Sequence, residues 1–174
     1  MTQTAGKGLI QIYTGDGKGK TTAALGLAMR AAGQGLRVSF IQFLKGEPGG
    51  EHLFASRYHP FDIVQGSAKS VFTQSRERLK EDVQQTLAMA LEQMQSGNYE
   101  LLILDEIFVA VSGRLITTEQ VLDFLEKKPD SIELVLTGRN APPEIVKRAD
   151  LVTEMHMVKH PFNRGIRARP GIEY

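Results

Sequence analysis

The sequence predicts an α/β fold with a mostly parallel sheet and helices on both of its faces. Short apolar runs rich in β-branched residues alternate with longer segments of helical period, which is the pattern of βαβ units. Several of the predicted strands are apolar almost throughout, as strands covered on both faces must be. A chain of 174 residues, 41% hydrophobic and 24% charged, suits a single domain over residues 1–174.

The first half of the chain predicts strands at residues 9–13, 37–43 and 61–64. A helix is predicted over residues 20–34, where small side chains recur at helical spacing and would let the helix lie close against the sheet. A second helix, over residues 76–95, has the clearest apolar stripe of the chain: Leu79, Val83, Leu87, Leu91 and Met94.

The second half predicts strands at residues 101–105, 132–136 and 151–155. The sequence TTEQ from Thr117 to Gln120 is typical of a capping box and predicts a helix that ends near Pro129. Pro142 and Pro143 suit the first turn of another helix.

Composition excludes several classes of function. The formal net charge of +1 gives no overall field that would attract nucleic acid or an anionic membrane, so neither is a predicted partner. The absence of cysteine excludes disulfides, thiolate metal sites and cysteine nucleophiles, and suits a reducing compartment. No apolar run approaches the roughly 20 residues that span a bilayer, and we expect a cytoplasmic protein.

The loop TGDGKGKTT at residues 14–22 predicts phosphate binding. A Walker A loop reads G-x-x-x-x-G-K-[ST], follows a strand and opens a helix. Here the G-K-T ending is present, but the first glycine is Gly15 where the pattern requires position 14, so the loop is one residue short. The flanking strand and helix favour a P-loop NTPase-like (RecA-like) fold over a glycine-rich turn with solvated lysines. The predicted nucleotide-binding residues are Gly15, Asp16, Gly17, Lys18, Gly19, Lys20, Thr21 and Thr22.

A carboxylate pair at a strand end predicts a metal site beside this loop. LLILDE brings Asp105 and Glu106 to the carboxyl end of a buried strand, where ligands bind in open α/β sheets. With the hydroxyl of Thr21 they would hold Mg²⁺ or Mn²⁺, Asp105 either as a ligand or as a supporting neighbour. Alone, such a run is only a strand that enters a loop. Arg139 follows another predicted strand and is a candidate nucleotide contact, as is Arg30; exposed arginines are the alternative.

Several blocks in order resemble the ATP-dependent corrinoid adenosyltransferases over nearly the whole length of the chain. They are TGDGKGKTTAALGLAMRAAGQG, VSFIQFLKG followed by GGE, LLILDE, LTGRNAPPEIVKRADLVTEM and VKHPFNRGIRARPGIEY. The resemblance implies transfer of the 5′-deoxyadenosyl group of ATP to the cobalt of a reduced Co(I) corrinoid, with release of triphosphate, in adenosylcobalamin biosynthesis or salvage. It also implies a homodimer and a reductase protein that supplies Co(I).

The family's chemistry assigns roles by motif position. Because Co(I) is a very strong nucleophile, no general acid or base is expected, and catalysis is expected to rest on Lys20, Thr21 and Glu106. In the family the phosphate chain lies reversed in its shortened loop, which exposes C5′ of the ribose. The tail after residue 158 is expected to pack over the site, and residues 44–52 are a candidate substrate loop or a surface turn.

The chain departs from the family between residues 65 and 75. The family's Gly-Phe-Thr-Trp stretch, which helps to shape the corrinoid pocket, is replaced here by QGSAKSVFTQS, and the chain has no tryptophan. Phe72 is the candidate corrinoid contact, or else a core aromatic. Two other functions stay open: a P-loop ATPase in which Glu106 activates water toward the γ-phosphate, and a non-catalytic protein that binds ATP and corrinoid.

Overall fold

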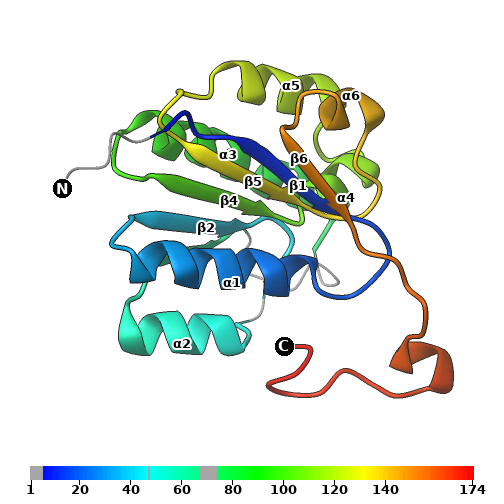
Figure 1. Ribbon diagram of the computed structural model, residues 1–174. Helices are drawn as coiled ribbons and strands as arrows, with labels where there is room; N and C mark the ends of the chain where they lie inside the picture. The colour runs from blue at the N-terminus through cyan, green and yellow to red at the C-terminus, as the bar shows by residue number, and fades with distance from the viewer. Residues whose placement is uncertain (1–5, 47, 67–73) are drawn as a thin grey trace.

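A single parallel sheet forms the centre of the computed structural model, which describes residues 6–46, 48–66 and 74–174. The strands lie in the order β3-β2-β4-β5-β1-β6, and every neighbouring pair is parallel (Figure 1). Their bounds are β1 (Ile10–Thr14), β2 (Val38–Gln42), β3 (Asp62–Gln65), β4 (Leu101–Asp105), β5 (Glu133–Thr137) and β6 (Leu151–Glu154). All six predicted strands are found, with ends shifted by at most one residue.

Helices cover both faces of the sheet (Figure 1). One face is covered by α1 (Lys20–Gly33), and α2 (Gly50–Tyr58) lies on the same side. The opposite face is covered by α3 (Arg76–Gln95), α4 (Ile107–Ser112), α5 (Thr118–Glu126) and α6 (Pro143–Val146). None of the helices in the described ranges is long and apolar enough to cross a membrane.

Alternation along β4 shows why both layers are needed. Leu102 and Leu104 pack into the cluster under α3, α4 and α5, whereas Leu101 and Ile103 pack into the cluster under α1. Each fully buried aliphatic side chain contributes about 1.5–3 kcal/mol relative to an exposed one. On the α1 side the helix contributes alanines, Ala24, Ala28 and Ala31, and their small size brings the helix backbone close to the sheet.

The helices α2 and α4 were not predicted. Residues 44–52 were expected to be a loop, but α2 begins at Gly50. Only Ala55 of α2 is buried, so the helix carries no apolar stripe that its sequence would reveal. The six residues of α4 are almost all apolar, and a run this short cannot be assigned from periodicity. Phe72 lies outside the described residues.

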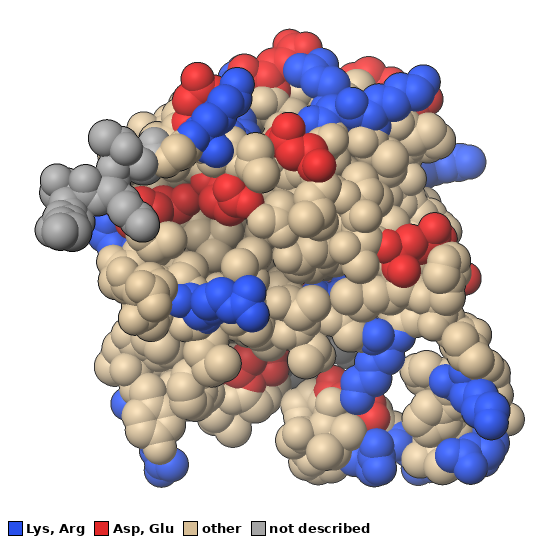
Figure 2. Space-filling view, in the orientation of Figure 1, with Lys and Arg blue, Asp and Glu red and all other residues tan. Residues whose placement is uncertain are grey.

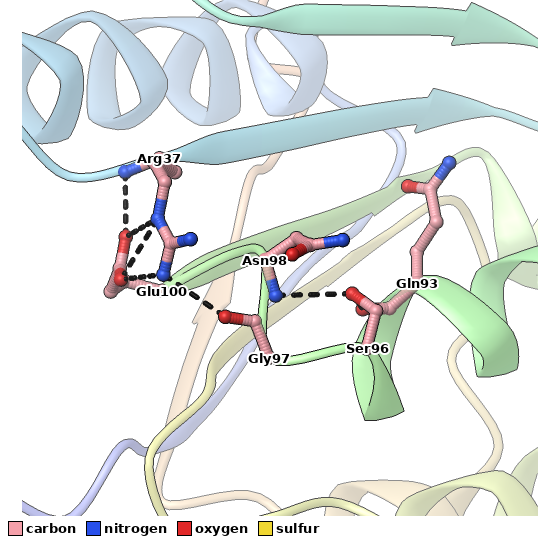
Figure 3. A network of polar contacts seen from close by, with 6 residues as sticks. All are labelled: Arg37, Gln93, Ser96, Gly97, Asn98 and Glu100. Carbon is pink, nitrogen blue, oxygen red and sulfur yellow. Dashed lines mark hydrogen bonds and ion pairs between the residues drawn. The ribbon is translucent and has the colours of Figure 1, made fainter.

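The amino ends of β2 and β4 are tied together by a polar cluster (Figure 3). The guanidinium group of Arg37 pairs with the carboxylate of Glu100 and donates to the carbonyl of Gly97 at 3.0 Å. The backbone N–H of Arg37 also donates to Glu100 at 2.7 Å. These contacts lie at the end of the sheet opposite to the glycine-rich loop.

Candidate functional site

The glycine-rich loop joins β1 to α1 at the carboxyl edge of the sheet. Gly15 and Gly19 have φ angles of 96° and 121°, a backbone conformation that glycine adopts without strain. The loop also packs tightly against the residue that follows β6: a Cβ atom at Gly15 or Gly17 would lie 2.4 or 2.7 Å from the carbonyl oxygen of Met155. The N–H of Gly17 donates to that same oxygen at 2.7 Å. The loop glycines are therefore required by the fold itself.

Lys20 opens α1 beneath the loop. Its side chain is only 9% exposed, and its Nζ donates to the carbonyl oxygens of Gly15 and Gly17 at 2.7 Å each. Burial lowers the pKa of Lys20, and the nearby charge of Arg139 acts in the same direction. The loop thus curls around one cationic group, as a phosphate site requires.

Asp105, the last residue of β4, is held by donors from other elements. It is 1% exposed and accepts hydrogen bonds from the Thr137 hydroxyl at 2.6 Å, the Thr21 hydroxyl at 3.0 Å and Nε2 of Gln42 at 3.1 Å. Burial raises the pKa of Asp105, while these hydrogen bonds oppose the rise. Both carboxylate oxygens are already in use by the protein.

Glu106 has different surroundings. It adopts a left-handed φ of 64° at the start of α4, and its backbone N–H donates to the Thr137 hydroxyl at 3.0 Å. In the described part of the chain no group donates a hydrogen bond to its carboxylate. Burial, followed by the charge of Asp105, raises the pKa of Glu106, while Lys20 and Arg139 act in the opposite direction. This carboxylate is the one that remains available to a ligand.

Arg139 follows β5 in a loop that needs unusual backbone angles. Gly138 has a φ of 139°, and a Cβ atom there would lie 2.8 Å from Cβ of Phe108. This tight turn leaves Arg139 facing the same cavity as Lys20 and Glu106. Arg30, by contrast, is exposed and is not among the cavity residues, so its contact with a nucleotide stays a prediction.

One cavity of about 950 Å³ joins these groups to a second wall that combines apolar and charged side chains. The phosphate loop, Asp105, Glu106 and Arg139 form its polar side. The other side is formed by residues of α1 and α2, by the segments that follow β2 and precede β3, and by the C-terminal segment. Outside the polar side the lining residues are Leu25, Gly26, Met29, Gln42, Leu44, Lys45, Gly50, Glu51, Phe54, Phe61, His160, Gly171, Ile172, Glu173 and Tyr174.

The C-terminal segment reaches the loop through an acidic residue. The Nζ of Lys18 lies 3.2 Å from the Glu173 carboxylate and donates to the carbonyl of Ile172 at 3.0 Å. Arg169 binds the same carboxylate and, as the main cause, lowers the pKa of Glu173 to about 2. The basic side chains of this segment are exposed, and Figure 2 shows Lys and Arg gathered over it. The tail does border the cavity, but with Glu173 and not with its cations.

The oxygen donors at the loop fit a hard divalent cation. Thr21 and Glu106 offer a hydroxyl and a carboxylate, which are the ligand types of Mg²⁺ and Mn²⁺. Among the residues that the structure describes, no group of three or more His, Asp or Glu side chains can hold a metal. A cation here would therefore take its remaining ligands from phosphate oxygens and water.

Sequence reasoning missed two residues of the polar cluster. Gln42 and Thr137 both end buried strands and both bind Asp105. The available signal was a polar residue at the carboxyl end of an apolar run, the same signal that identified Asp105. Gln42 also lies 3.4 Å from Glu51 of α2, which pairs with Lys45, so the cluster extends to the opposite wall of the cavity.

The chain is similar to a known family over nearly its whole length. The family described as ATP:corrinoid adenosyltransferase BtuR/CobO/CobP matches residues 6–174. A corrinoid adenosyltransferase of Sinorhizobium sp is 37% identical over 99% of this chain and 83% of the relative, and that of Pseudomonas aeruginosa is 34% identical over 97% and 84%. The corrinoid adenosyltransferase of Escherichia coli K12 is also 34% identical, over 97% and 86%.

A solved structure is similar in fold. The flagellar accessory protein FlaH of Methanocaldococcus jannaschii superposes with a TM-score of 0.56 at 11% identity, over 86% of this chain and 71% of that one. At this identity the likeness concerns the fold alone. The predicted α/β fold of P-loop NTPase-like type is confirmed.

Proposed function

The chain belongs to the ATP:corrinoid adenosyltransferase family, and from this premise we propose that it transfers the 5′-deoxyadenosyl group of ATP to the cobalt of a Co(I) corrinoid and releases triphosphate. The corrinoid is cob(I)yrinic acid a,c-diamide or cob(I)alamin. We further propose that the protein works in the cytoplasm as a homodimer, with a reductase that supplies Co(I).

The observation that carries the proposal is the joining of a phosphate loop and a partly apolar wall in one cavity of about 950 Å³. A transferase of this kind must hold two substrates at once, a polyanion and a large macrocycle, with the reacting atoms in line. The polar side supplies cations from the loop and from Arg139, and the other side supplies apolar and aromatic side chains beside a few charged ones. An ATPase would also use such a wall for the adenosine of ATP, so the product formed from ATP decides between the two functions.

The reaction is a displacement at carbon. The electron pair of cobalt attacks C5′ of the ribose. The Co–C bond forms while the C5′–O bond breaks, and the electrons of the C5′–O bond leave with the triphosphate. The cobalt is formally oxidised from Co(I) to Co(III). No proton is transferred in this step, so the chain needs no general acid or base.

The chain's own residues act by binding and by charge. Lys20, the loop amides and Arg139 would bind the triphosphate and stabilise the charge that develops on it. Thr21 and Glu106 would hold Mg²⁺, and a bound divalent cation supplies further neutralisation of the leaving phosphates. Asp105 would act through Thr21, whose hydroxyl it orients.

The shortened loop is compatible with an unusual phosphate pose. The N–H of Gly17 is bonded to Met155, so this loop amide already has an acceptor within the protein. We infer that the triphosphate contacts a subset of the loop amides, which supports a placement different from that of an ordinary P-loop enzyme.

The product of ATP tests the proposal. The protein is incubated anaerobically with ATP, Mg²⁺ and chemically reduced cob(I)alamin while the corrin absorbance is recorded. A light-sensitive Co–C product with stoichiometric triphosphate is expected. ADP and phosphate without a corrinoid change would identify an ATPase instead, and binding of both ligands without any product would identify a non-catalytic binding protein.

A further inference from the structure

One glycine of α1 has no explanation within the protein. Gly26 lies in the middle of the helix, where glycine is less favourable than alanine because it loses more backbone entropy on folding. A Cβ atom at this position would meet no described atom within 4 Å, so neither packing nor backbone conformation requires a glycine. Gly26 does, however, line the cavity, so a ligand bound there would lie beside it.

The face of α1 that carries Gly26 is turned toward the cavity. Thr22, Leu25, Gly26 and Met29 all line it, and their spacing of i, i+3, i+4 and i+7 places them on one face of a helix. The opposite face, with Ala24, Ala28 and Ala31, is buried against the sheet. The helix therefore has a protein-facing side and a cavity-facing side.

The cavity-facing side continues across to α2 and β3 as an apolar surface. Met29 is 63% exposed and Phe54 of α2 is 45% exposed, although both are large apolar side chains. Phe61, just before β3, lines the same wall. Apolar side chains around a cavity typically bury part of a ligand's surface.

We propose that Gly26, Met29 and Phe54 form the seat for the planar face of the corrinoid macrocycle, with Gly26 allowing that face to approach the backbone of α1. The inference rests on the proposed function. It names a binding surface on α1 and α2.

The position along α1 suits the second substrate. Gly26 is six residues beyond Lys20, which at 1.5 Å per residue is about 9 Å along the helix from the phosphate end. A macrocycle whose cobalt meets C5′ beside the triphosphate extends over the following turns of α1. The flat face of adenine also packs on apolar side chains, so the experiment measures the affinity for both substrates.

Side chains added at Gly26 test the proposal. The variants are Gly26→Ala and Gly26→Leu. The matched control is Gly33→Ala, because Gly33 lies on the same helix, has nothing within 4 Å of an added Cβ and does not line the cavity. The measurements are the melting temperature, equilibrium binding of hydroxocobalamin in the presence of MgATP, and the KM values for ATP and for cob(I)alamin.

The Gly26 substitutions are expected to weaken the binding of corrinoid and not that of ATP. Gly26→Ala should melt at or above the wild-type temperature, because alanine favours the helix. Its corrinoid affinity should fall severalfold and that of Gly26→Leu by about tenfold or more, while the KM for ATP changes by less than about twofold and Gly33→Ala behaves as wild type.

Two results would contradict the proposal. One is a loss of ATP affinity with unchanged corrinoid binding, which would assign the surface to the nucleotide. The other is normal binding of both substrates. The proposed function fails separately. If the wild-type protein forms no Co–C product but the Gly26 variants lose hydroxocobalamin binding, the seat stands without the transfer reaction.

Discussion

Asp105 and Glu106 are adjacent in the chain, but the fold gives their carboxylates different tasks. Asp105 is surrounded by protein donors from three elements, among them Thr137 and Gln42. Glu106 faces the cavity without a hydrogen bond from the described residues. A buried carboxylate that is fully used by the protein is suited to positioning, and a less occupied one is suited to binding a cation. We therefore expect substitutions at the two positions to differ in kind.

Asp105→Asn should mainly damage stability. An asparagine amide group would present N–H donors where the protein already supplies donors, so buried hydrogen bonds would be lost or left unpaired. The expected cost is about 1–3 kcal/mol, and each kcal/mol corresponds to roughly 2–4 °C in the melting temperature of a chain of this size. Differential scanning calorimetry measures it, and an unchanged melting temperature would contradict the positioning role.

Glu106→Gln should raise the stability of the ligand-free protein at neutral pH. The folded-state pKa of Glu106 is raised, so ionisation costs the folded state more than the unfolded state. This penalty is absent below the ordinary glutamate pKa, grows as the pH rises, and is complete above the raised pKa. The variant should therefore melt at a higher temperature than wild type at pH 7.5, with the difference vanishing toward pH 4. A lower melting temperature at pH 7.5 would count against this account.

Lys20→Ala should abolish efficient transfer. The variant loses the buried cation that the loop surrounds, and a loss of about 100-fold or more in kcat/KM is expected, which corresponds to roughly 2.7 kcal/mol of transition-state stabilisation. Lys18→Ala is the comparison, because Lys18 is more exposed and already pairs with Glu173; its loss should be only severalfold. Equal effects of the two substitutions would remove the special role of Lys20.

At the scale of elements, predictions from the sequence succeeded in two situations. Either an apolar pattern repeated over many residues, or characteristic residues marked the start or the end of an element. The helix α3 was predicted over its full range because one stripe faces the core. The phosphate loop and the LLILDE strand were predicted because few other structures explain glycines and carboxylates at these positions. The helix α2 was missed because tertiary contacts, and not its own pattern, stabilise it. The partners of Asp105 were missed because strand order, which no local pattern encodes, brings β2 and β5 beside β4.

The start of α5 allows a local test of this reasoning. The Thr117 hydroxyl accepts from the N–H of Gln120 at 3.2 Å, and Oε1 of Gln120 accepts from the N–H of Thr117 at 3.0 Å, as the capping box predicted. Thr117→Ala should lower the free energy of unfolding by about 1 kcal/mol, or the melting temperature by roughly 2–4 °C. The binding of ATP and of corrinoid should stay unchanged. Thr117→Ser keeps the acceptor and should melt close to wild type. If both variants melt alike, the cap does not contribute.

At the scale of the whole molecule, residues near the two ends of the chain meet at the border of the cavity. Lys18 and Glu173 are 155 residues apart in sequence, yet they meet beside the phosphate loop. The contact should weaken phosphate binding, because the Glu173 carboxylate pairs with Lys18, a cation that a bound phosphate would also use. With its pKa lowered to about 2, Glu173 is ionised throughout the working range of pH.

Glu173→Gln should therefore strengthen ATP binding. Without the competing carboxylate, Lys18 is free to interact with phosphate, and the KM for ATP should fall about two- to fivefold at low ionic strength. The difference should shrink in 1 M salt, where charges are screened beyond about 3 Å. Glu126→Gln is the control, since it makes the same charge change in an exposed ion pair with Arg148 that lies outside the cavity. A higher KM in Glu173→Gln would instead mean that Glu173 holds Lys18 in its binding position.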